Sequence, residues 1–492
     1  MSEFVGALDQ GTTSTRFAVI DHSGAIVAME QLEHAQSFPG PGLVEHDAAE
    51  IWANCEAVIS GALSTAGLSS TDLAAVGITN QRETTVAWND EGSPLAPAIV
   101  WQDTRTDELS QELAGQEGPD RFRESTGLPL STYFSAPKMR WLLDNVAAVG
   151  AAAARDQVHL GTVDAWLAWN LTGESLTDPT NASRTMLMGL SSLSWEPELC
   201  DAFGVPIRAL PSIVPSSGSL GECRGVLEGV PLAAILGDQQ AALFGQAGFA
   251  PGSAKNTYGT GCFLLVNTGS DVVRSASGLL TTVGYHIAGE APVYALEGSV
   301  AIAGAAVQWL RDGLGLIESA PDVERLAASV DDTGDVYMVP AFSGLFAPYW
   351  RPDARGVIVG LTRYTTDAHI ARATLESTAF QTADVLDAMA QDASIDLSEL
   401  RVDGGMTANE LLMQLQADAL GIPVIRPKLA ETTVLGAAYA AGLGVGFWRD
   451  TDEIGAMWQE DRRWLPRQSE SDRERSMARW HQAVERSFGW AT

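Results

Sequence analysis

Residues 4–21 read FVGALDQGTTSTRFAVID, and this stretch decides the predicted fold. Phe4 to Leu8 and Arg16 to Ile20 are apolar runs typical of strands, and the polar segment Asp9 to Ser14 between them contains a glycine. Residues 21–29 add a second turn and a third strand. The sequence therefore predicts an antiparallel meander whose first turn offers backbone N–H groups and hydroxyls.

A helix and a fourth strand follow the meander. Asp47 with Glu50 three residues later is a helix-capping start. The apolar stripe of this helix consists of Ile51, Cys55, Val58 and Ile59. Ala75 to Thr79 is then a strand, which completes one α/β unit.

A related pattern recurs in the middle of the chain. Ile235 to Gly237 is a short strand that ends at Asp238, and Gln239 to Gly245 is helical. The turn Gly259-Thr260-Gly261 then opens onto the strand Leu264 to Val266. Two Gly-Thr turns in two halves suggest a duplicated fold with a cleft between the copies. Because residues 246–253 read as a linker, we expect domains at 1–248 and 249–492.

The second half carries further expected elements. Glu297 to Asp312 is predicted as a helix of small residues closed by Gly313, and Thr366 starts another helix. Leu400 to Val402 is a strand ending in Asp403-Gly404-Gly405, after which Thr407 and Glu410 form a capping box. A strand, a double-glycine turn and a helix start make a nucleotide contact plausible. We expect Val434 to Trp448 to be a core helix and the tail after Asp450 to be helical.

Composition narrows the class of protein. A chain of 492 residues with 46% hydrophobic residues is globular and holds two large or three modest domains. The net charge of −32 arises from 62 acidic residues against only 30 basic ones, and lysine occurs only at Lys138, Lys255 and Lys428. The negative electrostatic potential that this charge creates repels nucleic acid and anionic membranes, so neither is an expected partner.

Other classes are excluded by absent motifs. The four cysteines are far apart and predict neither a zinc site nor a disulfide framework. The sequence has no secretion signal and no long apolar run, which predicts a cytoplasmic protein without a membrane span. It also lacks the P-loop and the dinucleotide fingerprint, so any phosphate is bound in another way. The two Gly-Thr turns could hold phosphates from both sides of a cleft with their N–H groups and hydroxyls, although each turn alone also fits an ordinary hairpin.

Two sets of polar residues suggest phosphoryl transfer to an alcohol. Asp9 and Asp238 each end an apolar strand and could divide Mg²⁺ binding and proton acceptance between them, although either alone fits a turn former equally well. A polyol site needs a carboxylate, a multi-donor cation and an aromatic wall. Glu83, Arg82, Trp101 and Tyr133 supply that set. In isolation, Arg82 and Glu83 also fit a solvated surface pair.

Several collinear blocks resemble the glycerol kinases, within the wider carbohydrate kinase family. The blocks are ALDQGTTSTRFAVID at 7–21, GITNQRETTVAW at 77–88, VWQDTRT at 100–106, TNASRTML at 180–187, GDQQAALFGQ at 237–246, AKNTYGTGCFLL at 254–265 and RVDGGMTAN at 401–409. The segments 133–145 and 356–376 are similar to the two signatures of the wider family.

The resemblance implies an α/β fold of two duplicated actin-like (ribonuclease H-like) domains, with mixed sheets flanked by helices and ATP in the cleft between them. It implies ATP-dependent phosphorylation of glycerol, with Mg²⁺, by a homodimer or homotetramer. It assigns the polyol pocket to Arg82, Glu83, Trp101, Tyr133, Asp238, Gln239 and Phe263. It assigns nucleotide contacts to Thr12, Thr13, Ser14, Arg16, Thr260, Gly304, Gln308, Gly405 and Asn409. Asp238 is then the catalytic base and Asp9 organises Mg²⁺.

Two alternatives remain at this stage. A sibling kinase for a longer polyol or a ketose such as xylulose would keep the phosphate turns and change the pocket. An actin-like chaperone or filament ATPase would have no alcohol pocket, and its ATP consumption would not depend on glycerol.

Overall fold

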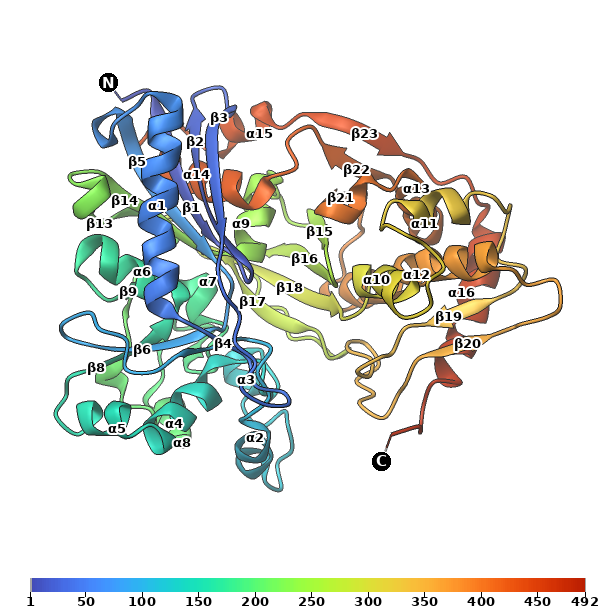
Figure 1. Ribbon diagram of the computed structural model, residues 1–492, viewed down its shortest axis with the longest axis horizontal. Helices are drawn as coiled ribbons and strands as arrows, with labels where there is room; N and C mark the ends of the chain where they lie inside the picture. The colour runs from blue at the N-terminus through green and yellow to red at the C-terminus, as the bar shows by residue number, and fades with distance from the viewer. Residues whose placement is uncertain (1, 492) are drawn as a thin grey trace.

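A computed structural model describes residues 2–491 of the chain. It has two lobes, each built around a mixed sheet (Figure 1). The first sheet consists of β1 (Phe4–Gln10), β2 (Ser14–Asp21), β3 (Ile26–Glu33), β5 (Leu73–Asn80), β13 (Ser217–Glu222) and β14 (Pro231–Gly237). The second consists of β15 (Ala254–Tyr258), β16 (Cys262–Gly269), β17 (Leu280–Tyr285), β18 (Val293–Val300), β21 (Leu400–Asp403), β22 (Val424–Pro427) and β23 (Glu460–Trp464).

The two sheets repeat one topology. The order β3-β2-β1-β5-β14 in the first sheet corresponds to β18-β16-β15-β21-β22 in the second. In both, the first two pairings are antiparallel and the last two are parallel. The predicted duplication is therefore confirmed, and the two Gly-Thr turns lie at equivalent places, between β1 and β2 and between β15 and β16.

Helices cover both sheets. The main ones are α1 (Ala48–Ala66), α6 (Val163–Thr172), α9 (Asp238–Gly245), α10 (Gly304–Asp312), α12 (Asp367–Ala393), α13 (Glu410–Leu420), α14 (Thr432–Gly444) and α16 (Glu470–Glu485). The predicted cap of α1 is confirmed, because the Asp47 carboxylate accepts from the backbone N–H groups of Ala49 and Glu50. Its stripe from Ile51 to Ile59 is buried against the first sheet.

Smaller elements extend the lobes. A side sheet next to the first one has the order β4 (Glu45–His46), β7 (Ala98–Ile99), β6 (Thr85–Asn89), β8 (Val158–Thr162). Short helices are α2 (Asp107–Ala114), α3 (Arg123–Thr126), α4 (Ser135–Asn145), α5 (Ala147–Ala153), α7 (Pro179–Ala182), α8 (Pro197–Phe203), α11 (Asp322–Ala327) and α15 (Thr451–Met457). Short strands are β9 (Leu176–Thr177), β10 (Met188–Gly189), β11 (Ser194–Trp195), β12 (Ser212–Ile213), β19 (Tyr337–Val339) and β20 (Val357–Val359).

The lobes meet at α9 and α14. A Cβ on Gly436 would lie 1.8 Å from the Ala241 carbonyl oxygen, and one on Gly245 would lie 1.9 Å from the Thr432 carbonyl oxygen, so only glycine lets these helices approach so closely. The apolar side of α14 packs against the first sheet, in a core that includes Val5 and Leu236. The expected core helix is thus confirmed, and its core belongs to both halves of the sequence. The division at residues 248 and 249 stays a prediction.

Three local predictions were wrong. Residues 297–300 belong to β18, and the helix expected from Glu297 starts only at Gly304. The cap of α13 is Asn409, whose side chain accepts from the Leu412 N–H, whereas the Thr407 hydroxyl donates to the Gly404 carbonyl. The tail contains β23, which pairs with β22, besides its helices.

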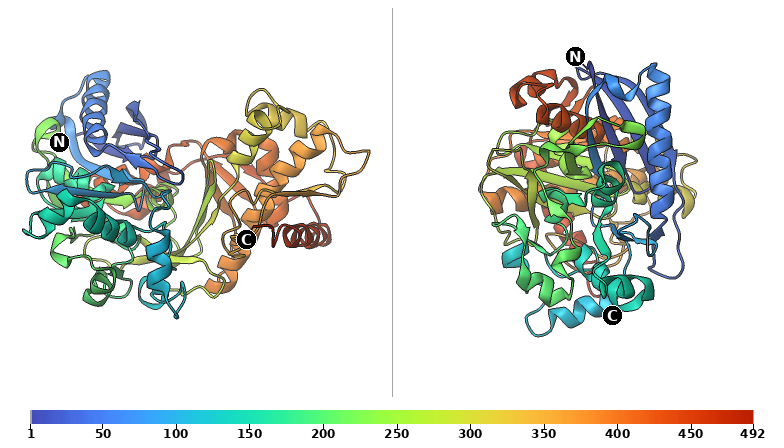
Figure 2. Two further views of the ribbon diagram at one scale, coloured as in Figure 1. Left: turned by 60° about the horizontal axis from the view of Figure 1, so that its bottom comes forward. Right: turned by 90° about the vertical axis from the view of Figure 1, so that its left-hand side faces the viewer.

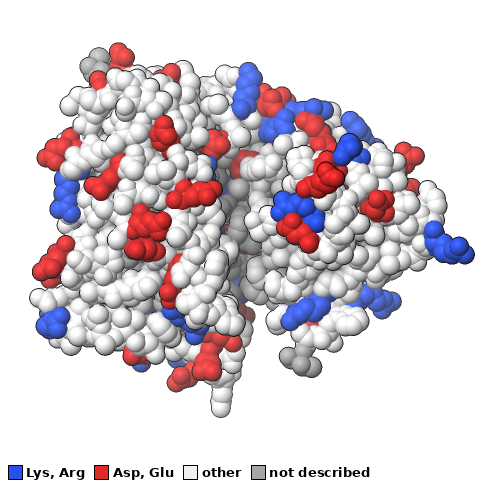
Figure 3. Space-filling view, viewed as in Figure 1, with Lys and Arg blue, Asp and Glu red and all other residues white. Residues whose placement is uncertain are grey.

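The surface agrees with the composition. Figure 2 shows the two lobes joined along one side, and Figure 3 shows the hollow between them together with more acidic than basic side chains on that face. Within residues 2–491, none of the helices is long and apolar enough to span a bilayer. The four cysteines are buried and free, as expected.

Candidate functional site

The first sheet brings Asp9 and Asp238 to one edge. Asp9 pairs in register with Thr79 of the parallel strand β5, and Asn80 at the end of β5 pairs with Gly237 of β14. Asp238 follows Gly237 directly and begins α9. Each carboxylate therefore follows or ends a strand, as the sequence predicted, and both lie at the carboxyl ends of β1 and β14, which flank β5 in the sheet. This edge is where open α/β sheets bind ligands.

Asp9 is buried beside a cation. Its Oδ2 lies 3.3 Å from Arg16 Nη2, and Arg16 Nη1 donates to Glu431 at 2.8 Å, which ties the strand after the first Gly-Thr turn to the residue before α14. Burial raises the pKa of Asp9 to about 6, against the opposing effect of Arg16.

Three aromatic rings form one wall of the site. The Trp101 ring lies 5.6 Å from that of Tyr133 and 6.5 Å from that of Phe263, in both cases edge to face. Phe263 comes from β16 of the second sheet, so the wall spans the two halves of the chain. The Trp101 indole N–H donates to the Thr12 hydroxyl at 3.1 Å, and the wall thus contacts the first Gly-Thr turn.

Arg82 is buried, with Tyr133 of the aromatic wall among the groups near it. Its Nε lies 3.1 Å from Asp238 Oδ1, and its two terminal nitrogens bind both carboxylate oxygens of Glu297. The bidentate pair fixes the plane of the guanidinium. The Asp238 carboxylate keeps about 30% of its surface exposed, so it can also be reached from the cleft.

Glu83 pairs with a different arginine. Arg184 Nε donates to Glu83 Oε1 at 2.5 Å, and Arg184 also lies 3.3 Å from Glu297 and stacks over the Tyr133 ring. The backbone of Glu83 has a φ of 60°, a left-handed conformation that costs a non-glycine residue energy and often occurs at functional sites. The surface-pair interpretation of Arg82 and Glu83 was wrong, because both are buried and paired with distant residues.

Two members of this buried charge cluster, Arg184 and Glu297, were not among the residues predicted from the sequence. Each stands inside a short polar or small-residue segment, Thr180 to Thr185 and Ala295 to Ser299, that gives no local signal of charge pairing. Although burial opposes it, Arg184 and Arg82 lower the pKa of Glu297, which keeps this carboxylate charged between the two guanidinium groups.

The predicted nucleotide residues of the second half lie together. The N–H groups of Ala303 and Ala305 donate to the Thr260 carbonyl, and the Gly304 N–H donates to the Gly259 carbonyl at 3.1 Å. Gly404 has a φ of 90°, and a Cβ there would lie 2.4 Å from the Tyr258 carbonyl oxygen. The double-glycine turn thus packs directly against the second Gly-Thr turn.

The nucleotide candidates differ in exposure. Thr13, Thr260, Gln308 and Gly405 are exposed, as residues at the rim of an open cleft are. Gln308 lies one helical turn after Gly304 on α10, on the same face. Ser14 is buried in β2, and Asn409 uses its side-chain oxygen to cap α13.

The site around Asp9 offers few protein ligands for a metal ion. In the stretch 2–491, the structure contains no group of three or more His, Cys, Asp or Glu side chains placed to hold one. Asp9 is an oxygen donor at the first turn, and Mg²⁺ usually combines one or two carboxylates with water and substrate phosphates. These residues fit Mg²⁺ bound mainly through a nucleotide.

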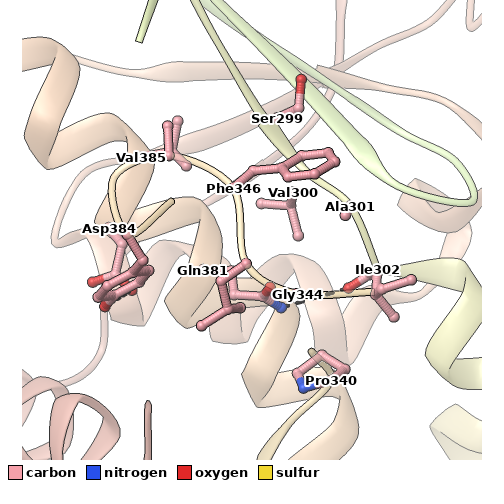
Figure 4. A pocket seen from close by; sticks show the side chains of 13 residues that line it. Ser299, Val300, Ala301, Ile302, Pro340, Gly344, Phe346, Gln381, Asp384 and Val385 are labelled. Atoms are coloured by element: carbon pink, nitrogen blue, oxygen red, sulfur yellow. Dashed lines mark hydrogen bonds between the residues drawn. The ribbon is translucent and has the colours of Figure 1, made fainter. Parts of the chain in front are cut away.

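A separate pocket lies in the second lobe (Figure 4). Val300 to Ile302, the loop from Pro340 to Tyr349, and Gln381 and Asp384 of α12 line it. The Asp384 carboxylate accepts from Tyr349, Trp480 and His481, so its hydrogen-bonding capacity is used within the lobe. The lining includes none of the predicted site residues.

Known proteins resemble this chain over its whole length. Glycerol kinase 2 of Streptomyces avermitilis is 60% identical over 99% of this chain and 97% of its own. The glycerol kinase of Methylobacterium radiotolerans is 58% identical over 100% of this chain and 99% of its own. The crystal structure of Plasmodium falciparum glycerol kinase with ADP matches with a TM-score of 0.93 at 37% identity, covering 98% of each chain.

More distant structures share the fold alone. Xylulose kinase from Lactobacillus acidophilus matches with a TM-score of 0.86 at 21% identity. Models of the FGGY family of carbohydrate kinases match this chain twice, the N-terminal domain at residues 4–245 and the C-terminal domain at residues 254–445. With both halves matched in order around the site described above, the chain belongs to the FGGY family of carbohydrate kinases.

Proposed function

We propose that this kinase transfers the γ-phosphoryl group of ATP to glycerol and forms sn-glycerol 3-phosphate. The observation that carries the proposal is the charged cluster around Arg82, Glu83 and Asp238 beside the aromatic rings of Trp101, Tyr133 and Phe263. It combines a cation, carboxylates and an aromatic surface, which suits a small molecule with alternating hydroxyl and CH groups. The full-length relatives named glycerol kinase support the same choice of substrate.

In this proposal each pocket residue has a distinct task. Arg82, Glu83 and Tyr133 orient the hydroxyls, Gln239 adds a polar contact, and Trp101 with Phe263 packs against the carbon edge. Asp238 takes the proton from the attacking hydroxyl, as a general base within reach of the cleft. Arg82 holds that carboxylate in place through its Nε.

The nucleotide is expected to span the two Gly-Thr turns. Backbone N–H groups and hydroxyls of the turns would bind the phosphates, because such turns are preorganised for anions. The residues proposed for this contact are Thr12, Thr13, Ser14, Arg16, Thr260, Gly304, Gln308, Gly405 and Asn409.

Asp9 is the proposed protein contact to Mg²⁺, directly or through water. When bound with ATP, Mg²⁺ neutralises charge on the phosphate oxygens. Arg16 beside Asp9 limits the negative charge that the turn presents to the phosphates.

The wider assembly is also a proposal. We expect two domains, 1–248 and 249–492, and a homodimer or homotetramer in the cytoplasm, as the family resemblance implies. Sedimentation velocity of the full chain tests the oligomeric state.

A coupled assay of ADP release tests the function. The chain is given Mg²⁺ and ATP with glycerol, a tetritol, xylulose or no acceptor. Glycerol should give the highest kcat/KM, and ADP release without an acceptor should be slow. A preference for xylulose, or ADP release that does not depend on any acceptor, would reject the proposal in favour of a sibling kinase or an actin-like ATPase.

A further inference from the structure

The few lysines of this chain are placed unusually. Lys138 and Lys255 are fully buried, whereas Lys428 is exposed. Lysine is almost never fully buried unless it is paired, because its charge loses hydration. Two of the three lysines of this chain are thus inside the protein, which points to sites where a compact ammonium group has a task.

Lys255 uses every donor of its ammonium group. Nζ donates to Oε1 of Gln239, to the Thr257 hydroxyl at 3.0 Å and to the Phe263 carbonyl at 3.3 Å. The three acceptors come from α9, β15 and β16, so the contacts join both halves of the chain. An ammonium group has three N–H donors, and each has a partner here.

Two of those partners belong to the proposed polyol pocket. Gln239 directly follows Asp238, and Phe263 forms part of the aromatic wall and follows the second Gly-Thr turn. Resting on the proposed function, we infer that Lys255 is a positioning residue of the acceptor site, whose ammonium group fixes Gln239 and Phe263 relative to each other across the two halves.

Burial disfavours the charged form of Lys255, and nearby carboxylates partly offset this cost. The charged groups that face it are Asp238 of α9, Asp403 of β21, Glu297 of β18 and Arg82 after β5. The three carboxylates attract the ammonium group and Arg82 repels it, while burial lowers the pKa of Lys255 to about 8. Above that pH the amine has one N–H donor fewer, so one of the three contacts is lost.

Arginine cannot replace this lysine without change. The guanidinium group is planar and larger, and its donors diverge in one plane, whereas the three acceptors here surround a single nitrogen. Lys255→Arg is therefore expected to behave as a disrupting substitution. The same is expected of Lys255→Met, which keeps an unbranched side chain one atom shorter and removes the donors.

The first test separates acceptor from nucleotide effects. Lys255→Met should raise the KM for glycerol about 10-fold or more, which corresponds to the loss of one hydrogen bond to a charged group, and change the Kd for ADP by less than about 2-fold. The matched control Lys428→Met removes an exposed lysine and should leave both values unchanged. A glycerol KM equal to that of the wild type in Lys255→Met would overturn the inference.

The pH profile gives a readout that a purely structural role would not move. In the wild type, kcat/KM for glycerol should fall as the pH rises through about 8, because the third donor is lost. In Lys255→Met this alkaline decrease should be absent. The same decrease in both proteins would assign it to another group and contradict the inference.

A third measurement covers the case in which Lys255→Met does not fold. Wild-type protein labelled with ¹³Cε-lysine gives one resonance for each of its three lysines, and the Lys428→Met and Lys138→Arg variants identify two of them. Saturating glycerol should shift the Lys255 resonance. Calorimetry on the same sample shows whether glycerol binds, which separates failure of this inference from failure of the proposed function. Glycerol that binds without moving this resonance overturns the role of Lys255, whereas glycerol that does not bind at all rejects the proposed function itself.

Discussion

The Nε of Arg82 lies 3.1 Å from Oδ1 of Asp238, while the other edge of the same guanidinium group is held by Glu297. The carboxylate proposed as the base thus contacts a cation that cannot rotate away. The contact with Arg82 is made by Oδ1 of Asp238, and about 30% of the surface of the Asp238 side chain stays exposed. The pair therefore fixes the orientation of Asp238 and leaves it able to accept a proton.

Replacing Asp238 by Asn tests the base directly. The amide keeps the size of the side chain but cannot accept the proton of the attacking hydroxyl, so kcat should fall by about 10²–10⁴-fold. The glycerol KM should change less than kcat, and ATP should still bind. Asp271→Asn, at an exposed position of the second half, is the control. More than a tenth of the wild-type kcat in Asp238→Asn would move the search for the base to Asp9.

Truncating Arg82 should reduce use of glycerol. Arg82→Ala removes charged donors from the acceptor pocket, so kcat/KM for glycerol should fall by about 10²-fold or more, with nucleotide affinity barely changed. Arg208→Ala, at an exposed salt bridge, serves as the control. Unaltered kcat and KM for glycerol in Arg82→Ala would remove this residue from the site.

Neutralising Glu297 should destabilise the protein. This carboxylate lies between Arg82 and Arg184, and all three side chains are buried. Breaking a buried ion pair from one side leaves uncompensated charge and costs about 3–5 kcal/mol. Glu297→Gln should show a loss of this order in denaturant unfolding, and the exposed Glu222→Gln should show none. A change below about 1 kcal/mol would mean that the two arginines do not depend on Glu297.

The parts of this structure that could be predicted from sequence are those with local causes. The meander from Phe4, the Asp47 cap and both Gly-Thr turns depend on alternating apolar residues, a capping side chain and glycine at the turn. Each of these signals lies within a few residues of the feature it specifies. Asp9 and Asp238 could each be placed at the end of a strand for the same reason, whereas their common sheet edge depends on the pairing of β1 and β14 with β5.

Features that depend on distant partners could not be predicted in this way. Glu297 was expected in a helix because its neighbours are small, yet Arg82 and Arg184, more than 100 residues away, stabilise it as a buried strand residue. The partner of Glu83 is likewise Arg184 and not its neighbour Arg82. The strand β23 forms because β22 offers it an open edge, a fact that its charged sequence does not reveal.

A buried histidine pair should make stability depend on pH. His46 and His34 lie with their ring centres 4.6 Å apart, and burial lowers the pKa of His46 to about 4. Between pH 6.5 and 4 the unfolded chain therefore binds a proton that the folded chain does not, and the free energy of unfolding falls as the pH is lowered. His46 contributes up to about 3 kcal/mol to this loss.

The comparison of two variants isolates that contribution. Chemical unfolding at pH 7 and at pH 5 should show a smaller loss of stability for His46→Gln than for the wild type. His22→Gln, in which the replaced ring is largely exposed, should behave like the wild type. An equal loss in all three proteins would mean that other groups account for the acid sensitivity.

Closure of the cleft is the remaining prediction, and it follows from where the contacts between the halves lie. Trp101 contacts Thr12 of the first turn and faces Phe263 of the second half, while Arg16 pairs with Glu431. Of these contacts, the one between Trp101 and Phe263 joins the two lobes near the site, whereas the outer rim of the hollow stays open (Figure 3). Because water in the site would compete with glycerol for the γ-phosphoryl group, glycerol and nucleotide together should draw the rims closer. Small-angle scattering with glycerol and a non-hydrolysable ATP analogue should then give a smaller radius of gyration than either ligand alone. If the curves with both ligands, with one and with none coincide, the two lobes act as a rigid body and water must be excluded by the pocket residues themselves.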